Sequence, residues 1–189
     1  KVLLDKSTQL KRLTEDLLDA AKITSGNETI HPQQLHFGEM VLQANGEFAE
    51  MMDEKNLDII SKVPSETMDA WIDGAKTWRI LSNLYANACK YALPQTRVYV
   101  DVSENENEVC FCMKNISKEP LNIPPDELME RFVRGDRARS GGGNGLGLAI
   151  SGDLAKLQGG RLELEISGDL FTARLYLPKY KKAEKGVDA

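Results

Sequence analysis

Three polar residues with helical spacing, Asn83, Asn87 and Lys90, are the first candidates for chemistry in this sequence. Residues three or four positions apart share one face of a helix, so the three side chains would project together. A neutral amide oxygen can complete an Mg²⁺ shell that consists otherwise of water and phosphate oxygens, and a neighbouring ammonium can hold a phosphate. The alternative is a solvated helix face with two structural asparagines. It is weakened because asparagine is a poor helix-interior residue and both asparagines lie beside an apolar stripe.

A second candidate is the segment 131–150, which joins basic residues to glycines. Four arginines occur between positions 131 and 139, five glycines follow between 141 and 147, and an apolar pattern then predicts a helix over residues 146–157. Free N–H groups at a helix start, the helix dipole and nearby guanidinium groups attract an anion, and glycines let a phosphate approach the backbone. The segment is therefore predicted to bind phosphate, and an ordinary surface loop is the alternative.

The composition favours a small anionic ligand over a polyanion or a membrane. The chain has 189 residues, of which 41% are hydrophobic and 28% charged, and its net charge is −5. An acidic chain argues against nucleic-acid binding, which depends on clustered lysine and arginine. No apolar run reaches the length of about 18 residues that a membrane-spanning helix needs, so no membrane contact is expected. The three cysteines, Cys89, Cys110 and Cys112, lack zinc-site or disulfide spacing, and a reducing, cytoplasmic compartment is expected.

Hydrophobic periodicity predicts an α+β fold in which the two sets of candidate residues lie on different helices. The expected architecture is a two-layer sandwich of one mixed β-sheet faced by three helices, preceded by one long amphipathic helix. The three helices are expected at residues 39–54, 75–92 and 146–157, and a short helix is expected to open at residues 124–126. The strands are expected at residues 35–37, 57–63, 68–72, 98–102, 109–113, 161–166 and 170–177.

The first 23 residues carry leucines at spacings of seven and of three to four, which predicts an amphipathic helix about 34 Å long. Such a helix cannot bury its apolar stripe alone, so it needs a partner helix in another part of the protein or in a second copy. The predicted organisation is this helical segment over residues 1–27, a linker over 28–34, a globular domain over 35–178 and a frayed polar tail over 179–189. Because the chain opens without methionine, we expect it to be a piece of a longer protein.

Three ordered motifs together resemble one family, the catalytic ATP-binding domain of sensor histidine kinases, within the gyrase, chaperone and histidine-kinase ATPase superfamily. Residues 83–91, NLYANACKY, are similar to its asparagine box. Residues 130–136, ERFVRGD, are similar to its phenylalanine box, and residues 143–148, GNGLGL, to its second glycine box. The resemblance covers residues 35–178. Residues 1–23 resemble the second helix of the family's dimerisation and histidine-phosphotransfer hairpin.

The resemblance implies ATP and Mg²⁺ as cofactors and gives each matching residue a role. Asn87 would bind Mg²⁺, Lys90 would contact a phosphate, and Tyr91 would lie by the adenine or ribose. Residues 132–144 would form a lid over ATP. The residues implied to bind the cofactors are Asn87, Lys90, Tyr91, Asn115, Ile123, Phe132, Arg134, Gly143, Gly145, Leu146, Gly147 and Leu148, and those implied to be catalytic are Asn83, Lys90 and Arg134.

The chain departs from the family at its first glycine box, DxGxG, where an aspartate bonds the adenine amino group. Residues 114–119 read KNISKE, so Asn115 stands in place of the aspartate and the glycines are absent, while Ile123 lies at the end of the box. An amide oxygen accepts the same hydrogen bond, but a bond to a carboxylate is roughly twice as strong. Weaker or less selective adenine binding than the family norm is therefore predicted.

The phosphoacceptor is the second departure. The family's acceptor histidine is followed by an acidic residue, whereas His31 and His36 are followed by proline and phenylalanine. Both are therefore assigned to the linker and its strand, and the acceptor is expected upstream of Lys1. The resemblance implies that the segment binds Mg-ATP and transfers the γ-phosphoryl group to that histidine, for relay to the receiver domain of a response regulator. It also implies a homodimer through the hairpin helices and a parent protein anchored in the membrane.

Two other functions remain open, and hydrolysis of ATP is disfavoured. A pseudokinase-like module that binds little nucleotide and serves in dimerisation is the main alternative, because the first glycine box is degenerate. A hydrolytic ATPase would need a glutamate base at the position of Asn83, and an amide has no useful basicity at neutral pH. A serine/threonine kinase of the same superfamily is a weaker alternative, because the heptad helix suits a histidine-bearing hairpin.

Overall fold

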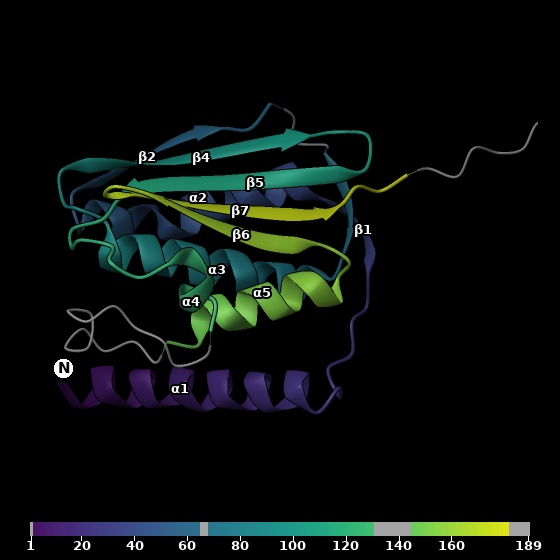
Figure 1. The fold of residues 1–189 in the computed structure, drawn as a ribbon, viewed down its shortest axis with the longest axis horizontal. Coiled ribbons are helices and arrows are strands. Elements are labelled where there is room, and N and C mark those ends of the chain that lie inside the picture. Colours follow the sequence, from purple (N-terminus) through teal and green to yellow (C-terminus); the bar gives the residue numbers. More distant parts are fainter. Residues whose placement is uncertain (1, 65–67, 131–144, 182–189) are drawn as a thin grey trace, which may run out of the picture.

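The computed structural model describes residues 2–64, 68–130 and 145–181 (Figure 1). These residues form the predicted α+β fold, in which helices cover one face of a mixed sheet. The helices are α1 (Val2–Thr24), α2 (Phe37–Asp53), α3 (Gly74–Tyr91), α4 (Pro125–Leu128) and α5 (Gly147–Leu157). The strands are β1 (Gln33–His36), β2 (Leu57–Lys62), β3 (Asp69–Ile72), β4 (Thr96–Glu104), β5 (Glu108–Ile116), β6 (Arg161–Ser167) and β7 (Leu170–Pro178). Their ends differ from the predicted ones by a few residues.

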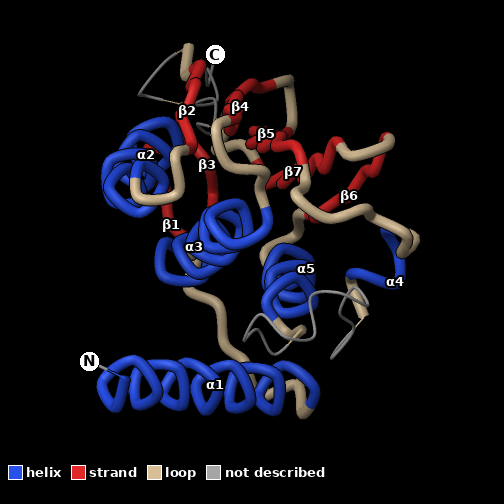
Figure 2. The backbone as a smooth tube through the Cα atoms, turned by 90° about the vertical axis from the view of Figure 1, so that its left-hand side faces the viewer, coloured by secondary structure: helices blue, strands red, loops and turns tan. Residues whose placement is uncertain are grey.

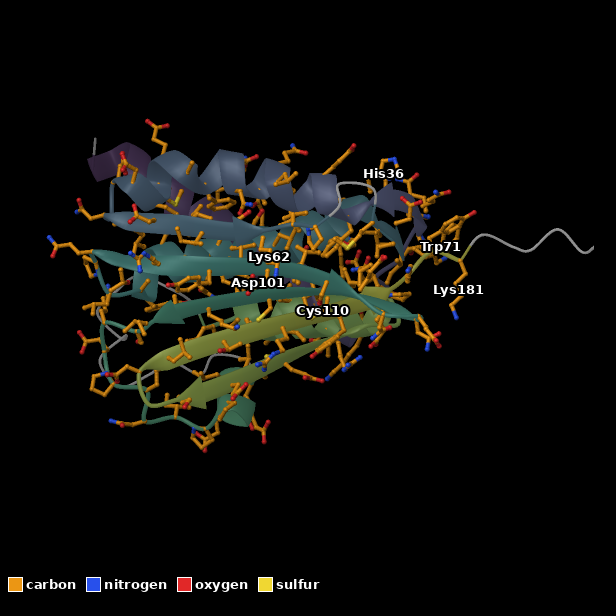
Figure 3. All side chains as sticks on the ribbon, turned by 90° about the horizontal axis from the view of Figure 1, so that it is seen from above. His36, Lys62, Trp71, Asp101, Cys110 and Lys181 are labelled. Atoms are coloured by element: carbon orange, nitrogen blue, oxygen red, sulfur yellow. The ribbon has the colours of Figure 1, made fainter. Side chains whose placement is uncertain are left out.

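The main sheet has five strands in the order β2-β4-β5-β7-β6. Strands β2 and β4 are parallel and the other neighbours are antiparallel, so the sheet is mixed as predicted. Alternate residues of β5, including Val109, Phe111 and Met113, are buried and face the helix layer of α2, α3 and α5. The opposite face carries Lys62, Asp101 and Cys110 and lies away from the helices (Figure 3).

Strands β1 and β3 form a separate two-stranded sheet, where the sequence predicted a single sheet. The chain beyond β7 reaches this small sheet, since Lys179 pairs with Ala70 and the Tyr180 N–H donates to the Asp69 carbonyl at 2.9 Å. The prediction of a tail frayed from residue 179 is therefore wrong for its first residues. Backbone pairing holds them, and side-chain patterns carry no record of backbone pairing.

Helix α1 lies on the side of α3 and α5 that faces away from the sheet (Figures 1 and 2). Arg79 of α3 pairs with Asp16 and, at 3.4 Å from Nε to Oδ2, with Asp19. The apolar stripe of α1 is covered only in part by the described residues. Ala20 is buried and Ile23 packs against the core, whereas Leu10, Leu13, Leu17 and Leu18 are exposed. Among the described residues, no helix is long and apolar enough to cross a bilayer.

The rotation of α3 about its own axis is fixed by Tyr85. This side chain is fully buried, stacks on Phe48 at 5.1 Å between ring centroids, and donates from Oη to Asn45 Oδ1 at 2.6 Å. Burial raises the pKa of Tyr85 well above its usual value. Residues two positions apart in a helix point about 200° apart around its axis. Because Tyr85 is buried against α2, Asn83 and Asn87 are therefore turned away from α2. The aromatic core thereby orients the face of α3 that carries the candidate residues.

Candidate functional site

The asparagine motif of α3 and the glycine segment at the start of α5 meet at one contact. The Asn83 side chain is 7% exposed, and its Nδ2 donates to the Gly147 carbonyl at 3.1 Å and to Ser151 Oγ at 3.1 Å. Two motifs that are 64 residues apart in the chain are thus joined by one amide. Because Asn83 is buried in this contact, its side chain holds the two helices together.

The start of α5 has the backbone geometry of an anion site. Gly145 has φ of +69°, a left-handed conformation that favours glycine. Leu146 is fully buried and occupies the N-cap position, where its side chain makes no capping hydrogen bond. A serine or aspartate at that position would accept from the first N–H groups of the helix, and leucine cannot. The start of α5, with Gly147 and the half-buried Leu148, thus has the backbone geometry that binds a phosphate oxygen and lacks a capping side chain at Leu146.

Asn87 and Lys90 lie further along the same face of α3. Both are half-buried, and no residue in the described part of the chain makes a hydrogen bond with the Asn87 side chain. The Lys90 ammonium lies 4.8 Å from the centroid of the Tyr91 ring, a cation–π contact that keeps it near the helix end. One neutral amide and one ammonium are thus available beside the α3–α5 contact.

The end of α3 is fastened to the loop that follows β5. Lys118 Nζ donates to the Lys90 carbonyl at 2.6 Å, and the Lys118 N–H donates to the Tyr91 carbonyl at 2.9 Å. The Leu93 N–H donates to the Ile116 carbonyl at 2.8 Å. These bonds place the end of β5 beside the end of α3, so that Asn115 and Tyr91 belong to one region.

Asn115 lies at the end of β5 on the face that packs against the helices. It is 4% exposed, and its Nδ2 donates to the Ile116 carbonyl at 3.3 Å. That bond commits the amide nitrogen to the backbone and leaves Oδ1 as an acceptor, to which no described residue donates. An inward-facing acceptor with this chemistry suits the amino group of an adenine.

The segment that replaces the first glycine box is closed by hydrogen bonds. Ser117 pairs with Ala92 in a β-bridge, and its N–H donates to the Asp169 carbonyl at 2.7 Å. Its hydroxyl donates to the Glu119 carbonyl at 2.7 Å. Ile123 follows in the half-buried connection to α4. A segment tied in this way admits a base less freely than one made of glycines.

Several predicted site residues lie outside the described residues. They are Phe132, Arg134 and Gly143, together with the rest of the lid segment 132–144. The structure brings together Asn83 and the start of α5, and it places Asn87, Lys90 and Tyr91 on one stretch of α3 that ends beside Asn115.

Ser151 is a site residue that sequence reasoning missed. It is fully buried on α5, and its hydroxyl donates to the Gly147 carbonyl at 2.8 Å while accepting from Asn83. Its one signal in the sequence is a hydroxyl within the apolar run of the last helix, four residues after Gly147. Such serines commonly bond the carbonyl four residues back, so the signal was weak by itself.

The opposite end of the α3–α5 interface has a similar contact that takes no part in the site. Gln158 Oε1 accepts from the Asp73 N–H at 2.8 Å and from Thr77 Oγ1 at 3.1 Å. Burial raises the pKa of Asp73, but backbone hydrogen bonds from His31 and Lys76 outweigh this, and the net pKa is lowered. Asp73 is therefore a charged N-cap that begins α3.

The available side chains fit a cation that is also bound by the phosphate oxygens of a nucleotide. No group of three or more histidine, cysteine, aspartate or glutamate side chains suited to a metal is found among the described residues. The free acceptors beside α5 are neutral amides, and Lys90 supplies positive charge. Burial raises the pKa of Cys89 to about 11 and also raises the pKa of Cys110 and Cys112, so these three thiols are protonated at neutral pH. The residues fit an Mg²⁺ ion held together with a nucleotide.

Comparison with known proteins agrees with this geometry. Residues 72–181 match the family described as histidine kinase-, DNA gyrase B-, and HSP90-like ATPase. The sensor protein kinase WalK of Staphylococcus haemolyticus (strain JCSC1435) is 31% identical over 165 residues, which cover 84% of this chain and 26% of that protein. The chain therefore spans about a quarter of the length of this relative.

Two solved structures share the fold. Full-length ShkA in complex with AMPPNP aligns with a TM-score of 0.79 at 23% identity, covering 97% of this chain and 39% of that chain. The histidine kinase ThkA in complex with the response regulator protein TrrA aligns with a TM-score of 0.71 at 18% identity, covering 92% of this chain and 49% of that chain.

Proposed function

The chain belongs to the histidine kinase-, DNA gyrase B-, and HSP90-like ATPase family, and from this we propose that it is the ATP-binding catalytic segment of a two-component sensor histidine kinase. Its substrate would be Mg-ATP, and the γ-phosphoryl group of the ATP would pass to a histidine outside residues 1–189. The observation that carries the proposal is the Asn83 contact, which joins the asparagine motif to the glycine-rich start of α5. Beside it lie the Lys90 ammonium and Asn87, whose side chain has no hydrogen-bond partner among the described residues.

Each residue of the site has a role that follows from its chemistry. Asn87 Oδ1 would hold the cation, Lys90 would hold a phosphate, and the N–H groups at Gly145 and Gly147 would bind phosphate oxygens. When bound, Mg²⁺ supplies positive charge that neutralises the phosphates. Asn115 Oδ1 would accept from the adenine amino group. Ile123, Leu146, Leu148, Tyr91 and the lid residues Phe132, Arg134 and Gly143 complete the proposed nucleotide site.

Phosphoryl transfer is favoured over hydrolysis because the site lacks a base where water would be activated. Asn83 stands at the position where hydrolytic relatives would need a glutamate, and its amide nitrogen is committed to Gly147 and Ser151. Transfer to a positioned histidine requires alignment and charge neutralisation rather than a strong base. Asn83 would act as a catalytic residue through the acceptor that it presents, and Lys90 and Arg134 through their charge.

The exposed leucines of α1 and the ThkA–TrrA structure indicate the proposed partners. The exposed leucines of α1 suit a homodimer through hairpin helices, with residues 1–27 as the second hairpin helix, 28–34 as a linker and 35–178 as the catalytic domain. The structure of ThkA with the response regulator TrrA supports a receiver domain as the recipient of the phosphoryl group. The proposed location is the cytoplasm.

A pseudokinase-like module is the second candidate, and the Ser117 contacts favour it. The segment that replaces the first glycine box is tied to Ala92, Asp169 and Glu119 rather than open to a base. Such a chain would dimerise and bind partners with little nucleotide affinity.

Calorimetry with Mg-ADP and Mg-AMPPNP separates the two. We expect saturable binding that Asn87→Ala and Lys90→Ala each weaken about tenfold, roughly 1.4 kcal/mol. Lys156→Ala is the matched control, because it removes one positive charge from the exposed last turn of α5. Absence of saturable binding by the unmodified chain would establish the module instead.

A further inference from the structure

The Ser151 hydroxyl contacts both groups that join α3 to α5, the Asn83 amide and the Gly147 carbonyl. It is fully buried, 2.8 Å from the Gly147 carbonyl and 3.1 Å from Asn83 Nδ2. Asn83 Nδ2 also reaches the same Gly147 carbonyl at 3.1 Å. The three groups therefore form a closed triangle of hydrogen bonds between the helices.

This triangle permits a single orientation of the Asn83 amide. The Gly147 carbonyl can only accept, so only the nitrogen side of the amide can face it. The Ser151 hydrogen is directed to that carbonyl, and its oxygen is then an acceptor that also demands the nitrogen side. A reversed amide would place its oxygen against two acceptors, at the cost of at least one buried hydrogen bond.

The acceptor side of Asn83 lies beside the start of α5, since a Cβ built on Gly147 would be 3.8 Å from Asn83 Oδ1. Among the described residues, the only fully buried side-chain polar atom without a hydrogen bond is Arg79 Nε. Asn83 Oδ1 accepts from no described residue and is not one of these fully buried atoms, so it keeps some exposure although Asn83 as a whole is 7% exposed. Asn87 is one helical turn further along the same face of α3, and its side chain also lacks a described partner.

We propose that Ser151 is a positioning residue for the magnesium–nucleotide site, which it serves by fixing Asn83 so that its amide oxygen is offered to the cation or to a water bound to it. The inference rests on the proposed function. Side chains that orient the groups around a metal commonly change its affinity about tenfold or more when removed, without touching the metal. Loss of the Ser151 hydroxyl removes one of two constraints on the amide and leaves the Gly147 contact in place.

The test compares nucleotide affinity with and without the metal. Calorimetric Kd values for AMPPNP are measured in Mg²⁺ and in EDTA. The Kd in EDTA divided by the Kd in Mg²⁺ is the ratio that reports the contribution of the cation. For Ser151→Ala we expect this ratio to fall about tenfold while the Kd in EDTA stays within about twofold. The Asn83 side-chain NH₂ signals in ¹⁵N-edited spectra should shift in the same variant.

Thr77→Val is the matched control. It removes another fully buried hydroxyl from the α3–α5 interface, where Thr77 Oγ1 donates to Gln158 at 3.1 Å. Thr77 is six residues before Asn83, about 9 Å along the helix. We expect Thr77→Val to leave the ratio unchanged, even where it lowers the melting temperature.

The outcomes distinguish the inference from the function on which it rests. If the unmodified chain binds Mg-AMPPNP and Ser151→Ala leaves the ratio unchanged, or weakens both Kd values equally, Ser151 is merely structural and the inference fails alone. If the unmodified chain shows no Mg²⁺-dependent binding, the proposed function and the inference fail together.

Discussion

The phosphate end and the adenine end of the proposed nucleotide site are held in place by different kinds of contact. At the phosphate end, the Asn83 side chain links α3 to the start of α5 through Gly147 and Ser151. At the adenine end, Asn115 bonds its own neighbour Ile116, and the segment beyond it is held by backbone bonds and short-range contacts. A buried side-chain contact between two helices thus determines the first end, while backbone hydrogen bonds, including that of the Ser117 N–H to the Asp169 carbonyl, hold much of the second.

The difference shows which part of such a site tolerates change. A contact between two helices loses its function when one buried amide is altered, because no neighbouring group can replace it. A segment that is held mainly by backbone hydrogen bonds can change its side chains and still present one acceptor. The chain has lost the glycines of the first box while Asn115 keeps an inward-facing oxygen, in agreement with this contrast.

The largest expected effect is that of Asn83→Asp. A carboxylate at this buried position would face the Gly147 carbonyl, and the Ser151 hydroxyl could donate to it only by giving up its bond to that carbonyl. We therefore expect the free energy of unfolding to fall by about 3 kcal/mol. Asn87→Asp is the matched change on the half-buried part of the same face, and it should cost less than about 0.5 kcal/mol. Urea denaturation measures both. Equal losses for the two variants would show that the Asn83 contact does not hold the phosphate end.

Gly145→Ala should have the next largest effect. Its φ of +69° is costly for a residue with a Cβ, so we expect a loss of about 1–2 kcal/mol in unfolding free energy. Gly46 lies in α2, and a Cβ there meets nothing within 4 Å. Gly46→Ala should instead stabilise the protein by about 0.5–1 kcal/mol. If both variants changed stability in the same direction, the backbone at the start of α5 would not be under this constraint.

The fold was largely predictable from the sequence because its elements have strong hydrophobic patterns. Alternation gave the paired strands β4 and β5, and a helical stripe gave α3 with its three polar residues on one face. The separate β1–β3 sheet and the pairing of Lys179 with Ala70 were missed, because they depend on backbone hydrogen bonds between distant segments.

The candidate site was predictable by position but not by contact. Spacing placed Asn83 and Asn87 on one helix face and Gly147 at a helix start. That Asn83 faces inward, with its nitrogen bound to Gly147 and Ser151, follows only from the packing of α3 on α5. Ser151 was missed for the same reason, since its role exists only once the two helices are together.

At the adenine end, Asn115→Asp should have a moderate effect on affinity. A carboxylate accepts a stronger hydrogen bond from the adenine amino group, so we expect Mg-ADP to bind about threefold more tightly, roughly 0.7 kcal/mol. Asn122→Asp is the control, because it adds the same charge at an exposed position in the nearby loop. Calorimetry with ADP and GDP checks the result. The gain should be limited to ADP, since the guanine carbonyl offers an acceptor in place of the amino group, and a gain shared with GDP or with Asn122→Asp would remove Asn115 from the adenine contact.

The smallest expected effect separates the two lysines at the end of α3. Lys118 is exposed and donates to the Lys90 carbonyl, so Lys118→Met removes a charge from a helix C-terminus and should cost about 0.3–0.5 kcal/mol of unfolding free energy. Because this interaction is solvent-exposed, the cost should shrink further in high salt, and the Kd for Mg-ADP should stay within about twofold. Lys118→Arg keeps the charge and should behave like the unmodified chain. A loss of nucleotide binding in Lys118→Met as large as that in Lys90→Ala would mean that Lys118 contacts the nucleotide itself, and its bond to the Lys90 carbonyl would then not be its main role.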